Sequence, residues 1–189
     1  MSIYHKTSVQ IQEELKEIEK AQGNPRAFSV LYDRYYRDIY VFIFRRLESE
    51  AHCEDIVSQV FFKAMTNIHK YKFKGVPFSA WLFRIASNEL NQYFRKSNKT
   101  RHVSIEEEGV HKLSEESDDL SLDPYLLSNI LNKLDPKEVE LLELRYFEAL
   151  SIKETAYILG ITESNVKVKV FRLLNKIKKK VAKEGWGNE

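Results

Sequence analysis

Aromatic and cationic side chains alternate along the stretch HKYKFKGVPFSAWLFRIASNELNQYFRKSNK, which runs from His69 to Lys99. Aromatic rings can stack on unpaired bases at about 1–3 kcal/mol per base, and neighbouring cations can hold a phosphate backbone. Part of this set has helical spacing, and residues such as Trp81 are equally well explained as core. Tyr71 and Phe73 alternate with lysines just before Gly75, so we predict that these two rings contact exposed bases.

The charges of the chain are segregated, although the net charge is only +2. Residues 63–101 hold nine Lys/Arg against one acid, and residues 163–183 hold eight against one. Between them, residues 104–123 hold eight acids and one Lys. The alternative is a set of ordinary solvated helix faces, but two basic segments separated by an acidic one favour a nucleic-acid partner.

The second basic segment overlaps a helix-turn-helix pattern, LSIKETAYILGITESNVKVKVFRLL, at residues 150–174. Ser151 and Glu154 have the spacing of a capping box, which predicts a helix over about 152–159. Gly160 can adopt the left-handed conformation that ends this helix, and Thr162 can cap the next one. In this motif the second helix enters the major groove of duplex DNA.

The spacing of the second helix separates an inward from an outward face. Val166, Val170, Leu173 or Leu174, and Ile177 fall on the inward face. The outward face presents hydrogen-bonding and cationic groups, so we predict a DNA-binding surface there, extended by residues 176–183. A plain helical hairpin with a basic surface is the alternative. The predicted DNA-binding set is Ser164, Asn165, Lys167, Lys169, Arg172 and Lys176 of the second helix, with Lys153 of the first.

Helical spacing also dominates the rest of the chain, and no stretch alternates as a strand does. Asn24 and Pro25 start a helix with the apolar stripe Phe28, Leu31, Tyr35, Ile39 and Phe42. Further helices are predicted over about 51–68, burying Ile56, Val60, Ala64 and Ile68, and over about 78–96, with Trp81, Leu82, Ile85, Ala86 and Leu90 inward. Helical structure restarts at Asp123-Pro124 and again at Asp135, where Glu138 completes a capping box.

The chain is therefore predicted to be all-α, with two small helical domains on a flexible acidic linker. The first domain, a helical bundle, spans residues 1–102 and the second, with the helix-turn-helix, spans 124–189. Residues 103–123 form the linker, because this acidic, serine-rich stretch gains too little from burial to order itself.

Several classes of protein are disfavoured. The six glycines form no phosphate-cradling loop, and the five histidines show no zinc spacing, so we expect neither an enzyme nor a bound metal or cofactor. No apolar run is long enough to span a membrane, and the N-terminus lacks an export pattern. The single cysteine, Cys53, suits the cytoplasm.

Four stretches, in order, resemble the RNA polymerase sigma factors of bacteria, and the compact extracytoplasmic-function (ECF) type of the sigma-70 family above all. These stretches are FSVLYDRYYRDIYVFIFRR, EDIVSQVFFKA, FKGVPFSAWLFRIASNELNQYFRK and LLELRYFEALSIKETAYILGITESNVKVKVFRLLNKIKK. Together they lie within about residues 25–98 and 124–180, with a linker where the family has one.

The resemblance implies a factor that binds core RNA polymerase and directs promoter-specific initiation, with promoter DNA as duplex and as non-template single strand. The core-binding residues would be Glu54, Asp55, Ser58, Gln59 and Phe62. The minus-ten element would be opened by Lys70, Tyr71, Lys72, Phe73, Lys74, Trp81, Arg84, Asn88, Gln92 and Arg95. Arg145 would contact a phosphate near the minus-thirty-five element, and an anti-sigma factor is a further implied partner.

Two departures from the family pattern limit what carries over. Ser58-Gln59 stands where the family often has Gln followed by an acid, and Val168 stands where a small polar residue is usual. The competing interpretation is an autonomous helix-turn-helix regulator that binds duplex DNA as an oligomer, with the first domain serving for dimerisation or sensing. Such a protein would not need the aromatic and cationic stretch before Trp81.

Overall fold

The computed structural model describes residues 8–47, 49–97, 113, 124–131 and 133–185. Every secondary-structure element in these ranges is a helix, which confirms the all-α prediction. The described residues divide into two compact units. The predicted linker lies outside the described residues, apart from Leu113. None of the described helices is both long and apolar enough to cross a membrane.

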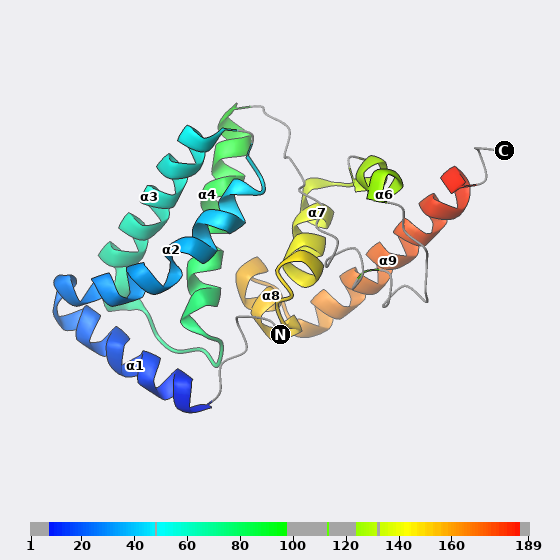
Figure 1. The fold of residues 1–189 in the computed structure, drawn as a ribbon. Helices are drawn as coiled ribbons and strands as arrows, with labels where there is room; N and C mark the ends of the chain where they lie inside the picture. Colours follow the sequence, from blue (N-terminus) through cyan, green and yellow to red (C-terminus); the bar gives the residue numbers. More distant parts are fainter. Residues whose placement is uncertain (1–7, 48, 98–112, 114–123, 132, 186–189) are drawn as a thin grey trace. The chain divides into compact units, whose positions relative to one another are not determined.

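The first unit is a helical bundle (Figure 1). Its elements are α1 (Ser8–Gly23), the short 3-10 helix η1 (Pro25–Phe28), α2 (Ser29–Phe44), α3 (Glu50–Asn67), the 3-10 turn η2 (Ile68–Lys70) and α4 (Phe78–Ser97). Helices α2, α3 and α4 pack against one another, and α1 packs against η1, α2 and η2.

The apolar stripe predicted for the first long helix forms the centre of this unit. Its members Phe28, Leu31, Tyr35, Ile39 and Phe42 are all buried. The ring of Phe42 meets the ring of Phe83 from α4 edge-on, at 4.9 Å between centroids. The stripe predicted for α3 is also buried, whereas Trp81 and Ile85 of α4 are only half-buried.

Local signals at the helix starts behave as the sequence predicts, with one adjustment. The Asn24 side chain accepts a hydrogen bond from the backbone N–H of Arg26 at 3.0 Å. It caps η1, however, and α2 proper begins only at Ser29. Cys53, near the start of α3, is fully buried, and its Sγ is 3.7 Å from the Tyr40 carbonyl oxygen.

Helix α1 has no counterpart among the predicted helices. Its buried residues Glu14, Ile18 and Ala21 are spaced as one helix face. The first of them is a carboxylate, so the stripe is not recognisable as apolar in the sequence. Its burial depends on partners from other helices, which the sequence does not place next to it.

The second unit contains α6 (Pro124–Leu131), α7 (Pro136–Leu142), the π-helical turn η3 (Glu143–Phe147), α8 (Ile152–Leu159) as far as Ala156, and α9 (Glu163–Gly185). Helices α6 and α7 both pack against α9. The core of the unit is built from Leu127, Ile130, Leu142, Leu144, Val166, Leu173 and Ile177. Val166, Val170, Leu173 and Ile177 therefore face inward as predicted, while Leu174 is only half-buried.

The predicted caps and turn of the helix-turn-helix are all present. Asp135 and Ser151 each form a complete capping box, with Glu138 and Glu154 respectively. Gly160 ends α8 in the left-handed conformation with φ 68°. The Thr162 Oγ1 accepts a hydrogen bond from the N–H of Asn165 at 3.2 Å. These signals are local, which is why the sequence alone predicts them.

We expect Gly160→Ala to lower the free energy of unfolding of the second unit by about 1–2 kcal/mol, because a Cβ is unfavourable in the left-handed region. Gly160→Asn should cost less, since asparagine tolerates this conformation. Denaturant unfolding followed by circular dichroism measures both. Gly23→Ala is the control, because a Cβ there meets nothing within 4 Å and the φ is not positive. Equal losses for all three variants would contradict the role given to Gly160.

Candidate nucleic-acid interface

Helix α9 presents a cationic and hydrogen-bonding face to solvent. Ser164, Asn165, Lys167, Lys169 and Arg172 are all exposed, as their spacing predicts. The groups lie in the first three turns of the helix, which is the part that enters a major groove in this motif. Their contacts with DNA stay a prediction.

Two large apolar side chains share this face and were not among the predicted site residues. Val168 is 45% exposed and Phe171 is 68% exposed. Both fall outside the buried stripe and between cations, where a soluble helix normally shows polar groups. Apolar side chains on a recognition helix can contact the methyl group of thymine, which gives this face a means of reading sequence in addition to charge. The sequence could have indicated that Val168 is exposed, because this residue falls outside the buried stripe.

A basic pocket lies between α7 and α9. It has a volume of about 250 Å³ and is lined by Lys137, Glu138, Leu141, Lys169, Arg172, Leu173 and Lys176. Four of these residues are cationic. Lys137 was not among the predicted residues, because only the fold brings it next to α9. A pocket of this charge suits a phosphate of the DNA backbone.

The single carboxylate of the pocket is paired. Lys176 Nζ donates to both oxygens of Glu138, at 2.8 and 2.6 Å. Burial alone would raise the pKa of Glu138, but the hydrogen bonds from Lys176 and from the Asp135 backbone lower it below its ordinary value. The pair therefore stabilises the fold at neutral pH, and this contribution is lost as the pH falls through the lowered pKa. Lys176, predicted as a DNA-binding residue, is in part committed to Glu138.

Arg145 and Lys153 occupy different environments. Lys153 is exposed near the start of α8. Arg145, in η3, is half-buried, and its Nη1 donates to the carbonyl oxygen of Leu150. The chain between Arg145 and Leu150 passes through Ala149, which has a positive φ of 50°. Arg145 thus supports a strained turn, and its contact with a phosphate stays a prediction.

In the first unit, the predicted core-binding residues share one exposed face of α3. Glu54, Asp55, Ser58, Gln59 and Phe62 are all exposed, with the Phe62 side chain 63% accessible. Their spacing of three and four places them along one side of the helix. Met65 continues this line and is also exposed, although it was not predicted. The face combines acidic groups with a bare aromatic ring.

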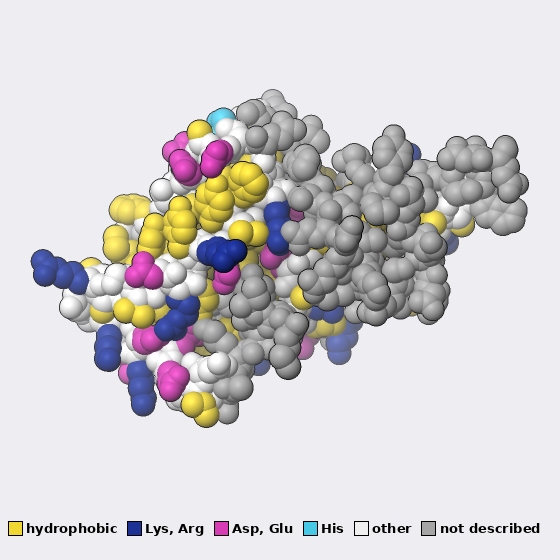
Figure 2. All heavy atoms as spheres, in the orientation of Figure 1, with side chains coloured by type: hydrophobic (Ala, Val, Ile, Leu, Met, Phe, Trp, Pro, Cys, Tyr) yellow, Lys and Arg dark blue, Asp and Glu magenta, His cyan; other side chains and the backbone are white. Residues whose placement is uncertain are grey.

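An aromatic row runs along α2 beside this face. Tyr32, Tyr36, Tyr40 and Phe44 follow one another at intervals of four, with neighbouring ring centroids 5.2, 6.1 and 5.7 Å apart. Tyr32 also packs against Phe61 of α3 at 4.7 Å. Figure 2 shows hydrophobic side chains gathered in a row where α2 and α3 lie.

The two rings predicted to contact bases, at the loop between η2 and α4, differ in exposure. Phe73 is 44% exposed, and Lys70, Lys72 and Lys74 around it are exposed as well. Tyr71, in contrast, is only 8% exposed, which corrects the expectation that both rings are free. Its ring meets Phe78 and Trp81 edge-on, each at 5.2 Å.

The predicted residues of α4 also lie along one side of their helix. Asn88 and Arg95 are exposed, while Trp81, Arg84 and Gln92 are half-buried. The single acid of this basic segment, Glu89, is buried and paired with Lys63 Nζ at 2.6 Å. Because Glu89 is buried, its carboxylate does not offset the positive charge on the exposed side of α4. Among the described residues, no group of three or more His, Cys, Asp or Glu is placed to hold a metal ion.

A helical bundle with an exposed loop of aromatic and lysine residues, joined in one chain to a helix-turn-helix, is typical of DNA-binding proteins that act in transcription. Residues 31–100 match the family model of sigma-70 region 2, and residues 126–177 match that of sigma-70 region 4. The chain belongs to the sigma-70 family of RNA polymerase sigma factors, and several of its relatives are of the ECF type. The identification made from the four sequence stretches is thereby confirmed.

The curated relatives include three ECF RNA polymerase sigma factors. The chain is 32% identical to BldN of Streptomyces coelicolor over 82% of its own length and 61% of that protein's. It is 28% identical to SigM of Bacillus subtilis, over 78% of this chain and 91% of that one. It is 29% identical to SigW of Bacillus subtilis, over 86% and 91%. The chain thus spans less than two thirds of the Streptomyces relative but nearly all of the two Bacillus relatives.

Two solved structures share the fold. CnrH, in complex with the cytosolic domain of CnrY, has a TM-score of 0.57 at 23% identity, over 86% of this chain and 93% of that chain. The sigma factor RpoE from Bartonella quintana, in complex with the anti-sigma factor NepR, has a TM-score of 0.56 at 22% identity, over 82% and 96%. At these identities the comparison establishes the fold alone.

We expect Glu138→Gln to tighten binding of the chain to duplex DNA at low salt and to steepen the salt dependence of log K by about one unit. Glutamine keeps an oxygen for the capping box, while the substitution removes a negative charge from the basic pocket and frees Lys176. Fluorescence anisotropy with a labelled duplex over a series of salt concentrations measures the slope.

Lys137→Ala is the opposing control and should make the same slope shallower by about one unit. Unchanged slopes in both variants would remove the pocket from the DNA-binding surface.

Proposed function

We propose that residues 1–102 of this sigma factor bind core RNA polymerase and open the minus-ten element, and that residues 124–189 hold the minus-thirty-five element. The observation that carries this division is the difference in chemistry between two exposed surfaces. Helix α9 offers a cationic face suited to duplex DNA, whereas the loop before α4 offers the bare ring of Phe73 among three exposed lysines. A duplex reader has no need of the second surface.

The face of α3 supplies the contact with the polymerase in this proposal. An exposed aromatic ring bordered by polar and acidic groups is typical of a binding hot spot, in which a large side chain fills a pocket and the rim excludes water. Phe62 is the anchor, and Glu54, Asp55, Ser58 and Gln59 form the rim. The chemistry of transcription then belongs to the polymerase, and this chain supplies positioning.

Promoter opening is assigned to the loop and to α4. Phe73 stacks on an unpaired base of the non-template strand, and the lysines beside it hold the phosphates. Arg84, Asn88, Gln92 and Arg95 continue along α4 as a track for the same strand. Tyr71 supports the loop from within the core and does not itself reach DNA.

The upstream element is assigned to α9, with Lys153 and Arg145 beside it. Because the affinities of the two DNA contacts and of the polymerase contact combine in one assembly, α9 need not bind tightly alone. An anti-sigma factor is a proposed partner, as in the RpoE complex with NepR. The proposed compartment is the cytoplasm, where the polymerase acts.

The core contact is tested by Phe62→Ala. We expect this variant to weaken binding to purified core polymerase by about tenfold or more, since truncation of a central aromatic anchor typically costs 2 kcal/mol or more. Phe44→Ala is matched in side chain and is also exposed, but it lies on α2, and it should bind normally. If the chain forms no complex with core polymerase and protects a palindromic site by itself, an autonomous regulator is the better description.

Promoter opening is tested by comparing Phe73→Ala with Tyr71→Ala. Phe73→Ala should slow opening of a duplex promoter by about fivefold or more while leaving the closed complex and the thermal stability intact, because its ring would act only on unstacked bases. Tyr71→Ala should instead lower the stability of the first unit, because it leaves a cavity between Phe78 and Trp81. Permanganate reactivity of unpaired thymines reports opening. Equal loss of closed and open complexes in Phe73→Ala would exclude the base-contact role.

A further inference from the structure

The loop between η2 and α4 is attached at its start to α1. The Nε2 of Gln22 donates one hydrogen bond to the carbonyl oxygen of Ile68 and another to that of Tyr71, each at 3.0 Å. The Ile68 oxygen also accepts a hydrogen bond from the backbone N–H of Tyr71 within the turn, at 2.9 Å, so Gln22 is a second donor to it. Tyr71 is the residue at which η2 ends. One side-chain amide thus fixes the point at which the chain leaves η2.

The end of the loop is attached to the same helix. Phe78 is the first residue of α4, and its backbone N–H donates to Glu14 Oε2 at 3.3 Å. A carboxylate at this position satisfies an otherwise orphan N–H and suits the positive end of the helix dipole. Glu14 comes from more than sixty residues away in the sequence, so it caps α4 from outside.

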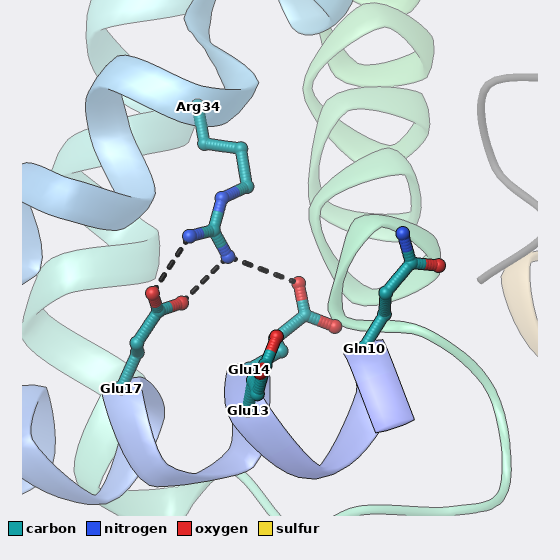
Figure 3. A pocket seen from close by; sticks show the side chains of 5 residues that line it. All are labelled: Gln10, Glu13, Glu14, Glu17 and Arg34. Atoms are coloured by element: carbon teal, nitrogen blue, oxygen red, sulfur yellow. Dashed lines mark hydrogen bonds and ion pairs between the residues drawn. The ribbon is translucent and has the colours of Figure 1, made fainter. Parts of the chain in front are cut away.

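The carboxylate of Glu14 is itself held in place. It is 2% exposed, and its other oxygen accepts a hydrogen bond from the hydroxyl of Tyr35. Burial, with the nearby charge of Glu14, raises the pKa of Tyr35, so the hydroxyl keeps its proton at any pH the cell experiences. Arg34 lies 4.0 Å from Glu14 and forms two hydrogen bonds with Glu17, at 2.6 and 2.7 Å. Figure 3 shows the two carboxylates of α1 converging on this guanidinium.

Between its two attachments the loop is open to solvent over residues 72–75, while Val76 is buried. Lys72, Phe73, Lys74 and Gly75 are exposed, and Gly75 turns the chain with a positive φ of 72°. Gln22 and Glu14 are eight residues apart on one helix, which separates them by about 12 Å along a rigid rod. The loop is therefore a strap fastened at both ends, with its aromatic tip free.

The geometry points to a positioning role for α1 in promoter opening: Gln22 and Glu14 hold the strap so that Phe73 meets the unpaired base already in place. This inference rests on the proposed function of the loop. A free loop would have to lose its conformational entropy at the moment of base capture, which weakens capture. A loop ordered beforehand by α1 avoids that loss. Gln22 and Glu14 act through Phe73 and touch no DNA.

The attachment of the loop to α1 can be tested without DNA, by the rate at which a protease cleaves the loop. Trypsin cleaves after lysine, and Lys72 and Lys74 lie at the exposed tip. Gln22→Met keeps the length of the side chain but removes both donated hydrogen bonds, so we expect cleavage of the full chain at these two lysines to accelerate about tenfold, the value for one to two lost hydrogen bonds. Gln12→Met is the matched control, because Gln12 is exposed on the same helix. Glu14→Gln, which weakens the cap on α4, should accelerate the same cleavage. Unchanged cleavage in both Gln22→Met and Glu14→Gln would overturn the inference.

The link to function is measured by a double-mutant cycle. Gln22→Met should slow promoter opening by the holoenzyme, and in the presence of Phe73→Ala it should have little further effect, because both variants remove the same base contact. Binding to core polymerase and the melting temperature should stay near those of the Gln12→Met control. Additive effects of the two substitutions, or an equal loss of core binding, would overturn a positioning role.

Different results refute the proposed function of the loop and the positioning role of α1. If Phe73→Ala opens promoters normally, the function proposed for the loop is wrong, whatever trypsin shows. If Phe73→Ala is defective in promoter opening, but Gln22→Met is cleaved by trypsin and opens promoters like the control, the loop works without help from α1.

Discussion

Burial of one stripe of side chains on the long helices decides which residues of this chain meet solvent. In α2, Leu31, Tyr35, Ile39 and Phe42 are withdrawn from water, and the helical period then fixes which residues face outward. The same rule in α9 commits Val166, Val170, Leu173 and Ile177 to the core and turns the cations toward solvent. Each functional face in this chain is therefore the reverse side of a packed one. Substitutions in a buried stripe would displace the opposite face as well as weaken the fold.

The sequence predicts those parts of the molecule that are decided within one or two helical turns. The capping boxes at Asp135 and Ser151, the left-handed Gly160 and the Thr162 cap all follow from residues a few positions apart. The family resemblance rests on the same kind of information, because the four matching stretches are continuous. The polar and cationic residues on the outward face of α9 could be predicted because its period is regular, whereas the exposed Val168 and Phe171 on the same face were not.

The features that sequence reasoning missed depend on residues far apart in the chain. Tyr71 looks like a surface ring until Phe78 and Trp81 are placed beside it. Glu14 looks like a solvated acid until Tyr35 and the start of α4 surround it, and this one buried charge was enough to hide α1. The pairing of Lys176 with Glu138 joins residues thirty-eight positions apart. Periodicity carries no information about such contacts, since each depends on which elements pack together.

The burial of Cys53 has a consequence for how this chain meets oxidants. Its thiol is enclosed beside α2, and burial raises its pKa to about 11, so almost no reactive thiolate exists at neutral pH. It is the only cysteine in the sequence, so a folded chain cannot form a disulfide within itself, and a covalent link to a second copy would require this thiol to be exposed first. The rate at which a thiol reagent labels the chain therefore reports how often α2 and α3 separate, which makes Cys53 an intrinsic probe of opening in the first unit.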